Sequence, residues 1–196
     1  MKRIVLATHN RDKATEFQQI FADLSVSVET LDDYPNVGPI EEDAETLEGN
    51  ALKKAREVYR LTGVPSLADD TGLEIGYLND APGVFSSRYA GAGATYADNV
   101  RKLLRDMRGV PPRRRGARFR CVLAFVPATG AVELTEGICA GTILEQPRGD
   151  RGFGYDPIFL PLGHPMTYAE MDSTLKNSVS HRAQAAQAMK VILSKY

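Results

Sequence analysis

The stretch Leu67–Ile75 limits the possible folds most strongly, because two adjacent carboxylates stand between two short apolar runs. Its order, Leu-Ala-Asp-Asp-Thr-Gly-Leu-Glu-Ile, predicts a strand, a tight turn and a second strand. Since side chains alternate between the faces of a strand, Asp69 and Asp70 are expected to point in opposite directions. A carboxylate at a strand end can hold a hard cation or serve as a general base. Asp, Thr and Gly are also common in ordinary turns, and taken alone the stretch favours that plainer interpretation.

Short apolar runs elsewhere in the chain predict the rest of a sheet. Residues 3–7 and 26–30 are expected to form strands, the first as a short apolar run and the second by alternation of apolar and polar residues. Residues 119–126 and 131–143 are long runs joined across Pro127–Gly130, which predicts a hairpin. Strands mixed with helices, together with one hairpin, indicate an α/β protein with a mixed sheet.

Four segments carry apolar residues at helical spacing. The first follows the polar loop Thr8–Lys13, so the chain is expected to open with a strand, a loop and a helix. A loop of this kind offers backbone N–H groups and the positive end of a helix dipole, which both favour phosphate. Thr46 and Thr95 are expected to cap the next two helices, and Ser178 or Ser180 the last one.

The chain has 196 residues, which corresponds to one large domain or one domain with two lobes. Its formal net charge of -1 argues against binding of nucleic acid through overall positive charge. Cys121 and Cys139 lie in apolar runs, and without an export signal they indicate a reducing compartment. No run approaches the length of a membrane span. These features predict a soluble cytoplasmic protein.

Four groups of polar residues stand at predicted loops or element boundaries, where functional residues concentrate. They are Thr8–Lys13, Glu41–Glu42 with Asp69–Asp70, Phe153–Asp156, and Lys176 with His181–Arg182. Each group also has an ordinary structural interpretation: the first as a helix start, the glutamates as a solvated acidic loop, and the third as a plain turn. His181 and Arg182 fall in the first turn of a helix, where a cation opposes the dipole, and this indicates an anionic or acceptor-rich partner.

Taken together, these groups predict a triphosphate site. Lys13, Lys176 and Arg182 provide cations for phosphates, beside the backbone donors of the first loop. Glu41 and Asp70 provide carboxylates for a metal that bridges phosphate oxygens. Two aromatic residues in the third group provide rings that can pack on a base. The sequence contains neither G-x-x-x-x-G-K-[ST] nor G-x-G-x-x-G, so it predicts neither a P-loop nor a dinucleotide site.

With these residues identified, the chain resembles the inosine/xanthosine triphosphate pyrophosphatases along essentially its whole length. The resemblance rests on seven motifs that occur in the family's order and at its spacing. They are Thr8-His9-Asn10-x-x-Lys13, Glu41-Glu42, Asn50-Ala51, Ala68-Asp69-Asp70-Thr71-Gly72-Leu73, the run from Ala81 to Tyr89, the run from Gly152 to Phe159, and Ser180-His181-Arg182.

The resemblance implies a fold and an activity. The fold is α/β: a long, mixed, twisted β-sheet with two α/β lobes around a central substrate cleft, and residues 1–196 form one nucleoside triphosphate pyrophosphatase domain with two lobes. The activity is hydrolysis of deaminated purine nucleoside triphosphates (ITP, dITP and XTP) to the monophosphate and pyrophosphate. Mg²⁺ is the implied cofactor, with one or more ions per active site, and the implied assembly is a homodimer. Neither a membrane nor nucleic acid is an expected partner.

The resemblance also implies roles for particular residues. Asp70 matches the catalytic proton acceptor and a metal ligand, and Glu41 matches its partner at the metal. Asp69 can hold one of these two roles instead. Arg182 or a protonated His181 is expected to donate to the 6-oxo group of the base. The implied substrate-binding residues are Thr8, His9, Asn10, Arg11, Asp12, Lys13, Thr71, Phe153, Gly154, Tyr155, Asp156, Lys176, His181 and Arg182.

One departure and two rival functions stay open at this stage. Gly49 stands before Asn50, where relatives often carry a glutamate, and this leaves open whether a secondary carboxylate of the metal site is missing. One rival is a non-catalytic purine nucleotide-binding or regulatory protein with the same pocket. The other is a nucleic-acid-binding module that uses Arg113–Arg115, Arg118 and Arg120. The near-zero net charge favours a solvated basic loop over that second rival.

Overall fold

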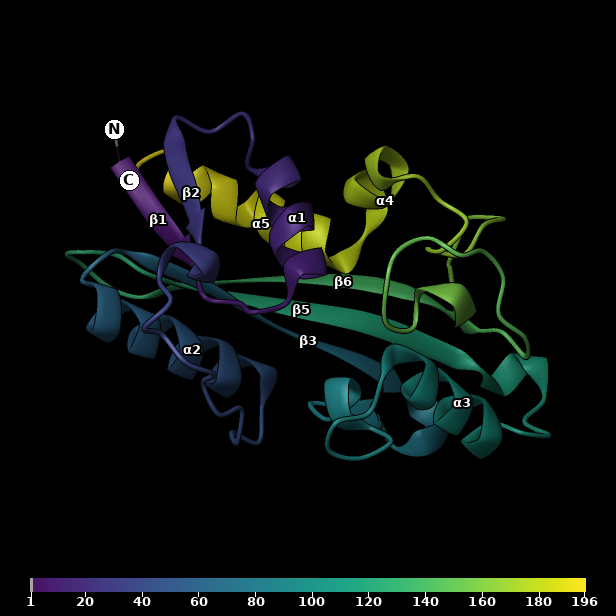
Figure 1. Cartoon of the computed structure of the whole chain (residues 1–196). Coiled ribbons are helices and arrows are strands. Elements are labelled where there is room, and N and C mark those ends of the chain that lie inside the picture. Colours follow the sequence, from purple (N-terminus) through teal and green to yellow (C-terminus); the bar gives the residue numbers. More distant parts are fainter. Residues whose placement is uncertain (1) are drawn as a thin grey trace. The chain divides into compact units, whose positions relative to one another are not determined.

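The computed structural model describes residues 2–196, and the strands in this range form one mixed sheet (Figure 1). Six strands follow the order β2-β1-β3-β5-β6-β7, and β4 pairs with β3 beside this path. The strands are β1 (Lys2–Leu6), β2 (Val26–Thr30), β3 (Ser66–Ile75), β4 (Pro82–Gly83), β5 (Gly116–Val126), β6 (Glu133–Ile143) and β7 (Phe159–Pro161). β1 is parallel to both β2 and β3, whereas β4 and β7 run antiparallel to their partners. The predicted α/β class with a mixed sheet is therefore confirmed.

Helices alternate with these strands along the chain. They are α1 (Arg11–Ile20), α2 (Leu47–Thr62), α3 (Tyr96–Asp106), α4 (Ser173–Val179) and α5 (His181–Leu193). Thr46 and Thr95 are N-caps as predicted, because their hydroxyls accept the backbone N–H groups of Gly49 and Asp98. Helix α4 was not predicted. Its cap is Asp172 and only Lys176 on it is buried, so the segment has no apolar stripe for a periodicity argument to detect.

The chain divides into two compact units, and the first comprises residues 2–70, 121–137 and 182–196. Its core lies between the sheet and helices α1 and α5, which cover one face, while α2 covers the other (Figure 1). The core residues come from five elements: Ile4, Leu6, Phe17, Phe21, Leu67, Cys121, Leu123, Phe125, Ala185, Ala186, Met189 and Leu193. The small residues of α5 let this helix lie close to the sheet, whereas α1 contributes two stacked rings, Phe17 and Phe21.

The second unit comprises residues 71–120 and 138–181. Its core joins α3 to the strand segments of this unit and to the aromatic residues near β7. The buried residues include Leu73, Ile75, Leu103, Met107, Phe119, Ile143, Ile158, Phe159 and Tyr168. Strands β3, β5 and β6 each contain residues of both units. The predicted central cleft between two lobes, and the reading of the chain as one domain, stay predictions.

The turn predicted at Asp-Asp-Thr-Gly is wrong, because β3 runs without interruption from Ser66 to Ile75. Its first residues pair with β1, through Leu6 opposite Leu67, and its last residues pair with β4, through Leu73 opposite Gly83. These ladders and the burial of almost every residue outweigh the local turn preference of the sequence. Gly72 has a packing role instead, since a Cβ there would come within 2.8 Å of the Gly83 carbonyl oxygen.

Candidate functional site

The first cluster of polar residues lies where the parallel pairing of β1 with β3 ends. Strand β1 pairs with β3 only up to Leu6 opposite Leu67, and β3 continues past that point to Asp69 and Asp70. Beyond its own last residue, β1 leads through a polar loop into α1. Ligands of α/β sheets bind in the crevice outside the carboxyl ends of parallel strands, so this is the expected place for a site.

Lys13 and Asp69 form an ion pair in this cluster, in which Asp69 is buried and Lys13 is half-buried. Asn10 caps α1 by accepting the backbone N–H of Lys13 at 3.1 Å, and the Lys13 ammonium lies 2.6 Å from Asp69. Burial lowers the pKa of Lys13, but the Asp69 carboxylate more than offsets this and the pKa is raised. Burial likewise raises the pKa of Asp69, but Lys13 and Lys54 outweigh it and the pKa is lowered. Asp69 is therefore an ionised anchor for Lys13.

Asp70 has a different environment from its neighbour in sequence. It is 5% exposed and accepts a hydrogen bond from the Asn50 side-chain amide at 3.0 Å. Burial raises the pKa of Asp70 more than Lys54 and Lys13 lower it, and the Glu42 carboxylate raises it further. Asp69 thus contacts α1 and Asp70 contacts α2, in agreement with the predicted opposite directions. Of the two, Asp70 is the stronger base.

Three residues outside the predicted set of site residues complete this side of the cluster. Lys54 is buried and pairs with Glu42, and Asn50 lies one helical turn before it on α2. Asn50 also accepts the backbone N–H of Ala44 at 2.9 Å, which fixes the acidic loop to the helix. The signal in the sequence was two polar residues on the apolar face of α2, because buried polar groups require partners. Glu41 is exposed, and its role as a metal ligand stays a prediction.

Arg182 approaches the same cluster from α5. It is 2% exposed and pairs with Glu16 on α1 at 2.5 Å, with its guanidinium 5.7 Å from the Phe17 ring centre. Its charge lowers the pKa of Asp69, after the larger effects of burial, Lys13 and Lys54. Sequence reasoning missed Glu16, although it lies one turn after Lys13 on the same helix. The prediction that Arg182 contacts the base stays a prediction.

The predicted phosphate loop borders a pocket of about 410 Å³ in the first unit. Thr8, His9 and Arg11 line it, together with residues from α1 and from the end of β2. Arg11 and Asp32 lie 3.6 Å apart on its rim, and both side chains are largely exposed. The start of α1 is therefore accessible on this side, as a phosphate-binding loop requires.

The carboxylates of the first cluster fit a hard divalent cation. In residues 2–196, no three His, Cys, Asp or Glu side chains come together as a ready-made metal site. Magnesium, however, is commonly held by one or two carboxylates together with water and substrate phosphates. Asp70 and the acidic loop before α2 supply oxygen donors of this kind beside two lysines. This donor set suits an ion that binds together with a polyphosphate.

The second unit carries a separate cluster around Asp156. Lys176 lies 2.5 Å from Asp156, and each side chain is 5% exposed. The same carboxylate accepts the backbone N–H of Phe153 at 2.9 Å. The Lys176 ammonium also lies 4.8 Å from the Phe153 ring centre and 5.6 Å from that of Tyr168. Gly152 is required beside the carboxylate, because a Cβ there would collide with Asp156.

The other predicted residues of this unit differ in their accessibility. Tyr155 is 4% exposed and donates its hydroxyl to the Ser86 carbonyl at 2.9 Å. His181 stacks on Phe119, with ring centres 4.5 Å apart and planes at 10°. Phe153 and Thr71 are half-buried. Contact of these residues with a substrate stays a prediction.

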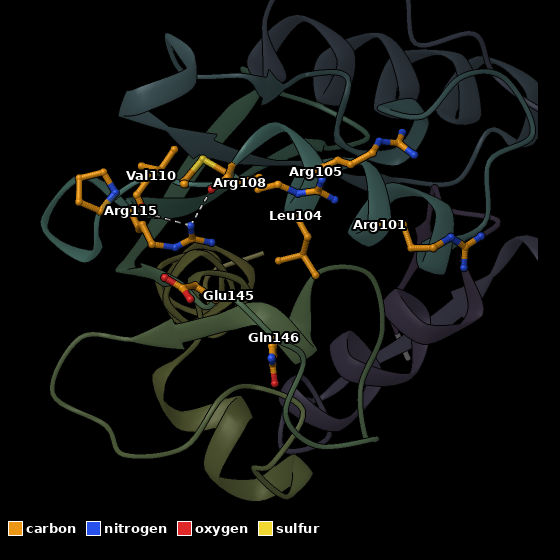
Figure 2. Close-up of a pocket in the computed structure, with 11 residues that line it drawn as sticks. Arg101, Leu104, Arg105, Arg108, Val110, Arg115, Glu145 and Gln146 are labelled. Carbon is orange, nitrogen blue, oxygen red and sulfur yellow. Dashed lines mark hydrogen bonds between the residues drawn. The ribbon is translucent and has the colours of Figure 1, made fainter.

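The basic loop has mainly structural contacts. Arg115 is 3% exposed and donates to the carbonyl oxygens of Ile143 at 2.6 Å, Met107 at 2.8 Å and Leu144 at 2.8 Å. Figure 2 shows it at one side of a pocket of about 530 Å³, which Arg101 and Arg105 of α3 and Arg108, just after this helix, also line. Arg115 thus neutralises the negative end of α3 rather than facing solvent as predicted.

Three other arginines named for the nucleic-acid rival have contacts in the same unit. Arg118 pairs with Glu74 at 2.6 Å, and Arg120 approaches the same carboxylate at 3.9 Å. Arg114 lies over the Tyr77 ring, 4.7 Å from its centre. These contacts favour a structural use of the cluster. No helix within residues 2–196 is long and apolar enough to cross a membrane.

Comparison with known proteins adds to this geometry. A model of the Ham1 family matches residues 4–192. A protein of Coxiella burnetii named dITP/XTP pyrophosphatase is 42% identical over 99% of this chain and 98% of its own length. A Desulforamulus reducens protein of the same name is 41% identical over 98% and 96% of the two chains.

Solved structures agree with the sequence comparison. The structure of a HAM1 protein from Coxiella burnetii matches with a TM-score of 0.90 and 42% identity, and covers all of both chains. A Mycobacterium abscessus structure, named nucleoside-triphosphatase or dITP/XTP pyrophosphatase, matches with a TM-score of 0.77 and 38% identity over 95% of this chain and 98% of its own. Both matches extend over nearly the whole fold.

Proposed function

Because the chain belongs to the Ham1 family, we propose that it hydrolyses deaminated purine nucleoside triphosphates to the monophosphate and pyrophosphate. The proposed substrates are ITP, dITP and XTP, and the reaction removes them from the nucleotide pool. The names of the relatives support this substrate class. The observation that carries the chemistry is the different environment of the two carboxylates Asp69 and Asp70 beside Lys13, where the parallel pairing of β1 with β3 ends.

The start of α1 is the proposed triphosphate site. The loop before the helix presents backbone N–H groups, and the helix dipole adds partial positive charge at the same place. Lys13 follows within the first turn, held in place by Asp69. Thr8, Asn10 and Lys13 would therefore contact phosphate oxygens, and Lys13 would stabilise the charge that develops on the leaving pyrophosphate.

Asp70 is the proposed proton acceptor. It is the carboxylate of the pair with the raised pKa, and the amide of Asn50 fixes its orientation. A base of this kind takes the proton from the water that attacks the α-phosphate. Asp69 cannot easily fill this role, since Lys13 lowers its pKa and occupies its carboxylate.

Mg²⁺ is the proposed cofactor, bound by Asp70 with Glu41 of the acidic loop. When bound, the ion neutralises phosphate charge and helps to activate water. Glu42 lies close enough to raise the pKa of Asp70, and its pairing with Lys54 holds the loop beside the site. The protein's own contribution here is to place carboxylate oxygens beside the proposed phosphate site, where they could hold the ion.

The second cluster is the proposed nucleotide-binding part. Phe153 to Asp156, Lys176 and Thr71 would contact the base and sugar, and His181 or Arg182 would donate to the 6-oxo group. Inosine and xanthosine carry an oxygen acceptor where adenine carries an amino group, so donors at this position discriminate against ATP. We propose further that the chain acts as one domain with two lobes, in the cytoplasm, and as a homodimer.

A pyrophosphate-release assay with ITP, XTP, GTP and ATP tests the proposal. We expect pyrophosphate from ITP and XTP, little from GTP and ATP, and no turnover in EDTA. Orthophosphate as the first product would contradict cleavage between the α- and β-phosphates. ITP binding without turnover would instead favour a regulatory nucleotide-binding protein. Gel filtration with light scattering tests the dimer separately.

A further inference from the structure

Tyr96 is a large aromatic residue at the surface of the second unit that none of the seven sequence motifs contains. It is the first residue of α3 and is 43% exposed. Its ring centre lies 5.8 Å from that of Phe153, and the two planes are tilted by 39°. Such a separation is that of an interacting aromatic pair. An exposed tyrosine thus extends the aromatic surface of a proposed nucleotide-binding residue.

The backbone around Tyr96 is firmly anchored. Thr95 and Asp98 form a capping box: the Thr95 hydroxyl accepts the Asp98 N–H at 3.2 Å, and Asp98 accepts the Thr95 N–H at 2.9 Å. A capping box fixes the first turn of a helix. Tyr96 therefore presents its ring from a rigid position, which lowers the entropy lost when a ligand binds against it.

Phe153 is fixed from a second direction. Its backbone N–H is bound to Asp156, and the Lys176 ammonium lies 4.8 Å from its ring centre. Lys176, Phe153 and Tyr96 thus follow one another as cation, ring and ring. The ammonium and its partner carboxylate are buried, whereas the Tyr96 end of the series is exposed. A flat π-system that reaches Phe153 would therefore meet Tyr96 as well.

We propose that Tyr96 is a further substrate-binding residue, against which the nucleobase packs together with Phe153. The inference rests on the proposed function for the nature of the ligand, a purine nucleotide. Every nucleobase has a π-face, so stacking adds affinity with little dependence on the base. Tyr96 therefore strengthens binding of inosine and guanine nucleotides alike, and base selection belongs to the hydrogen-bond donors of the site.

Binding of inosine monophosphate, measured by calorimetry without metal or turnover, tests the inference. We expect Tyr96→Ala to weaken binding by about 5- to 150-fold, the range for loss of one stacked ring, and Tyr96→Phe to bind as the wild type does. Guanosine monophosphate should lose affinity by the same factor. In the turnover assay, KM for ITP should rise while kcat is unchanged, as for loss of uniform binding.

Tyr77→Ala is the matched control. Tyr77 lies in the same unit and is 40% exposed, which is close to the exposure of Tyr96. The contact described for its ring is with Arg114, which is not a proposed site residue. Its removal should leave nucleotide affinity unchanged. Tyr96→Leu keeps the bulk without the ring and should bind as weakly as the alanine variant. Thermal unfolding of each variant shows whether a loss of affinity reflects loss of folded protein.

Two results would overturn the inference: an affinity of folded Tyr96→Ala within twofold of the wild type, or no monophosphate binding by the wild type itself. A Tyr96→Leu variant with full affinity would also overturn it, because Tyr96 would then only cover apolar surface. Failure of the proposed reaction has a different signature. In that case the wild type binds the monophosphate, and responds to Tyr96→Ala, but releases no pyrophosphate from ITP.

Discussion

Two lysine–aspartate pairs with a buried carboxylate, one in each unit, have similar geometry and different surroundings. Lys13 and Asp69 lie 2.6 Å apart, and Lys176 and Asp156 lie 2.5 Å apart. The first pair stands among further charges, since Lys54, Arg182 and Asp70 all act on it. The second stands beside aromatic rings and a backbone N–H. The first environment suits a polyanion with a metal, and the second suits a flat base.

The largest effect that this comparison predicts is on turnover by Asp70→Asn. The variant keeps an acceptor for Asn50 but cannot take a proton, so kcat for ITP should fall by about 10²- to 10⁴-fold, the usual contribution of a general base. Pyrophosphate release measures the fall, and thermal unfolding should show an intact fold. Asp69→Asn is the matched control, which should reduce kcat less and stability more. Near-normal activity of Asp70→Asn would exclude Asp70 as the base.

The second prediction concerns the stability of the pair beside the rings. Asp156→Ala leaves the Lys176 ammonium buried without its carboxylate and frees the Phe153 N–H, so the free energy of unfolding should fall by about 3–5 kcal/mol. Urea denaturation measures the change. Asp43→Ala removes the partner of Lys53 in a more exposed pair and should leave the midpoint unchanged. Equal denaturation midpoints for the two variants would show that burial does not determine how much an ion pair contributes to stability.

The sequence predicted local features of the fold better than contacts between distant segments. The strand Val26–Thr30, the caps Thr46 and Thr95, and the opposite faces of Asp69 and Asp70 depend on residues close in sequence, and they were found. The turn predicted at Asp69 to Gly72 was wrong because pairing with β1 and β4, which is a tertiary contact, decides the conformation of that segment.

Partners distant in sequence could not be read from a local pattern. Arg182 and Glu16 are 166 positions apart, and the sequence around either residue does not indicate that the two form an ion pair. Lys54 was missed because a lysine on a helix is ordinarily solvated, and only burial reveals its need for Glu42. Motif order indicated which segments matter, whereas the charge environment that separates Asp69 from Asp70 required coordinates.

A third prediction tests whether Lys13 contacts the phosphates of the proposed ligand and Lys176 its base. Lys13→Met should weaken binding of ITP by about 10- to 150-fold, the value of one hydrogen bond to a charged group, and should affect inosine monophosphate much less. Lys176→Met should weaken both ligands by the same factor, because its position beside Phe153 concerns the base. Calorimetry with both nucleotides gives the two ratios. A preference for the triphosphate that survives Lys13→Met would contradict the assignment.

The smallest effect is expected at Gly49, where the sequence resemblance led us to expect a glutamate. Gly49 is the third residue of α2 and donates its N–H to the Thr46 hydroxyl at 3.0 Å. A glutamate there would complete a capping box with Thr46, so its carboxylate would turn back toward the helix start. That gain and the better helix propensity are offset by crowding, since a Cβ would lie 2.8 Å from the Ala44 Cβ.

Gly49→Glu should therefore change the free energy of unfolding by no more than about 1 kcal/mol in either direction. The Mg²⁺ concentration for half-maximal turnover should stay within twofold of the wild type, because a capping carboxylate adds no metal ligand. Gly49→Ala separates the crowding from the carboxylate. A fall of tenfold or more in the Mg²⁺ requirement, in Gly49→Glu but not in Gly49→Ala, would instead place a missing metal-site carboxylate at this position. In that case Gly49 would leave the acidic side of the first pair one carboxylate short.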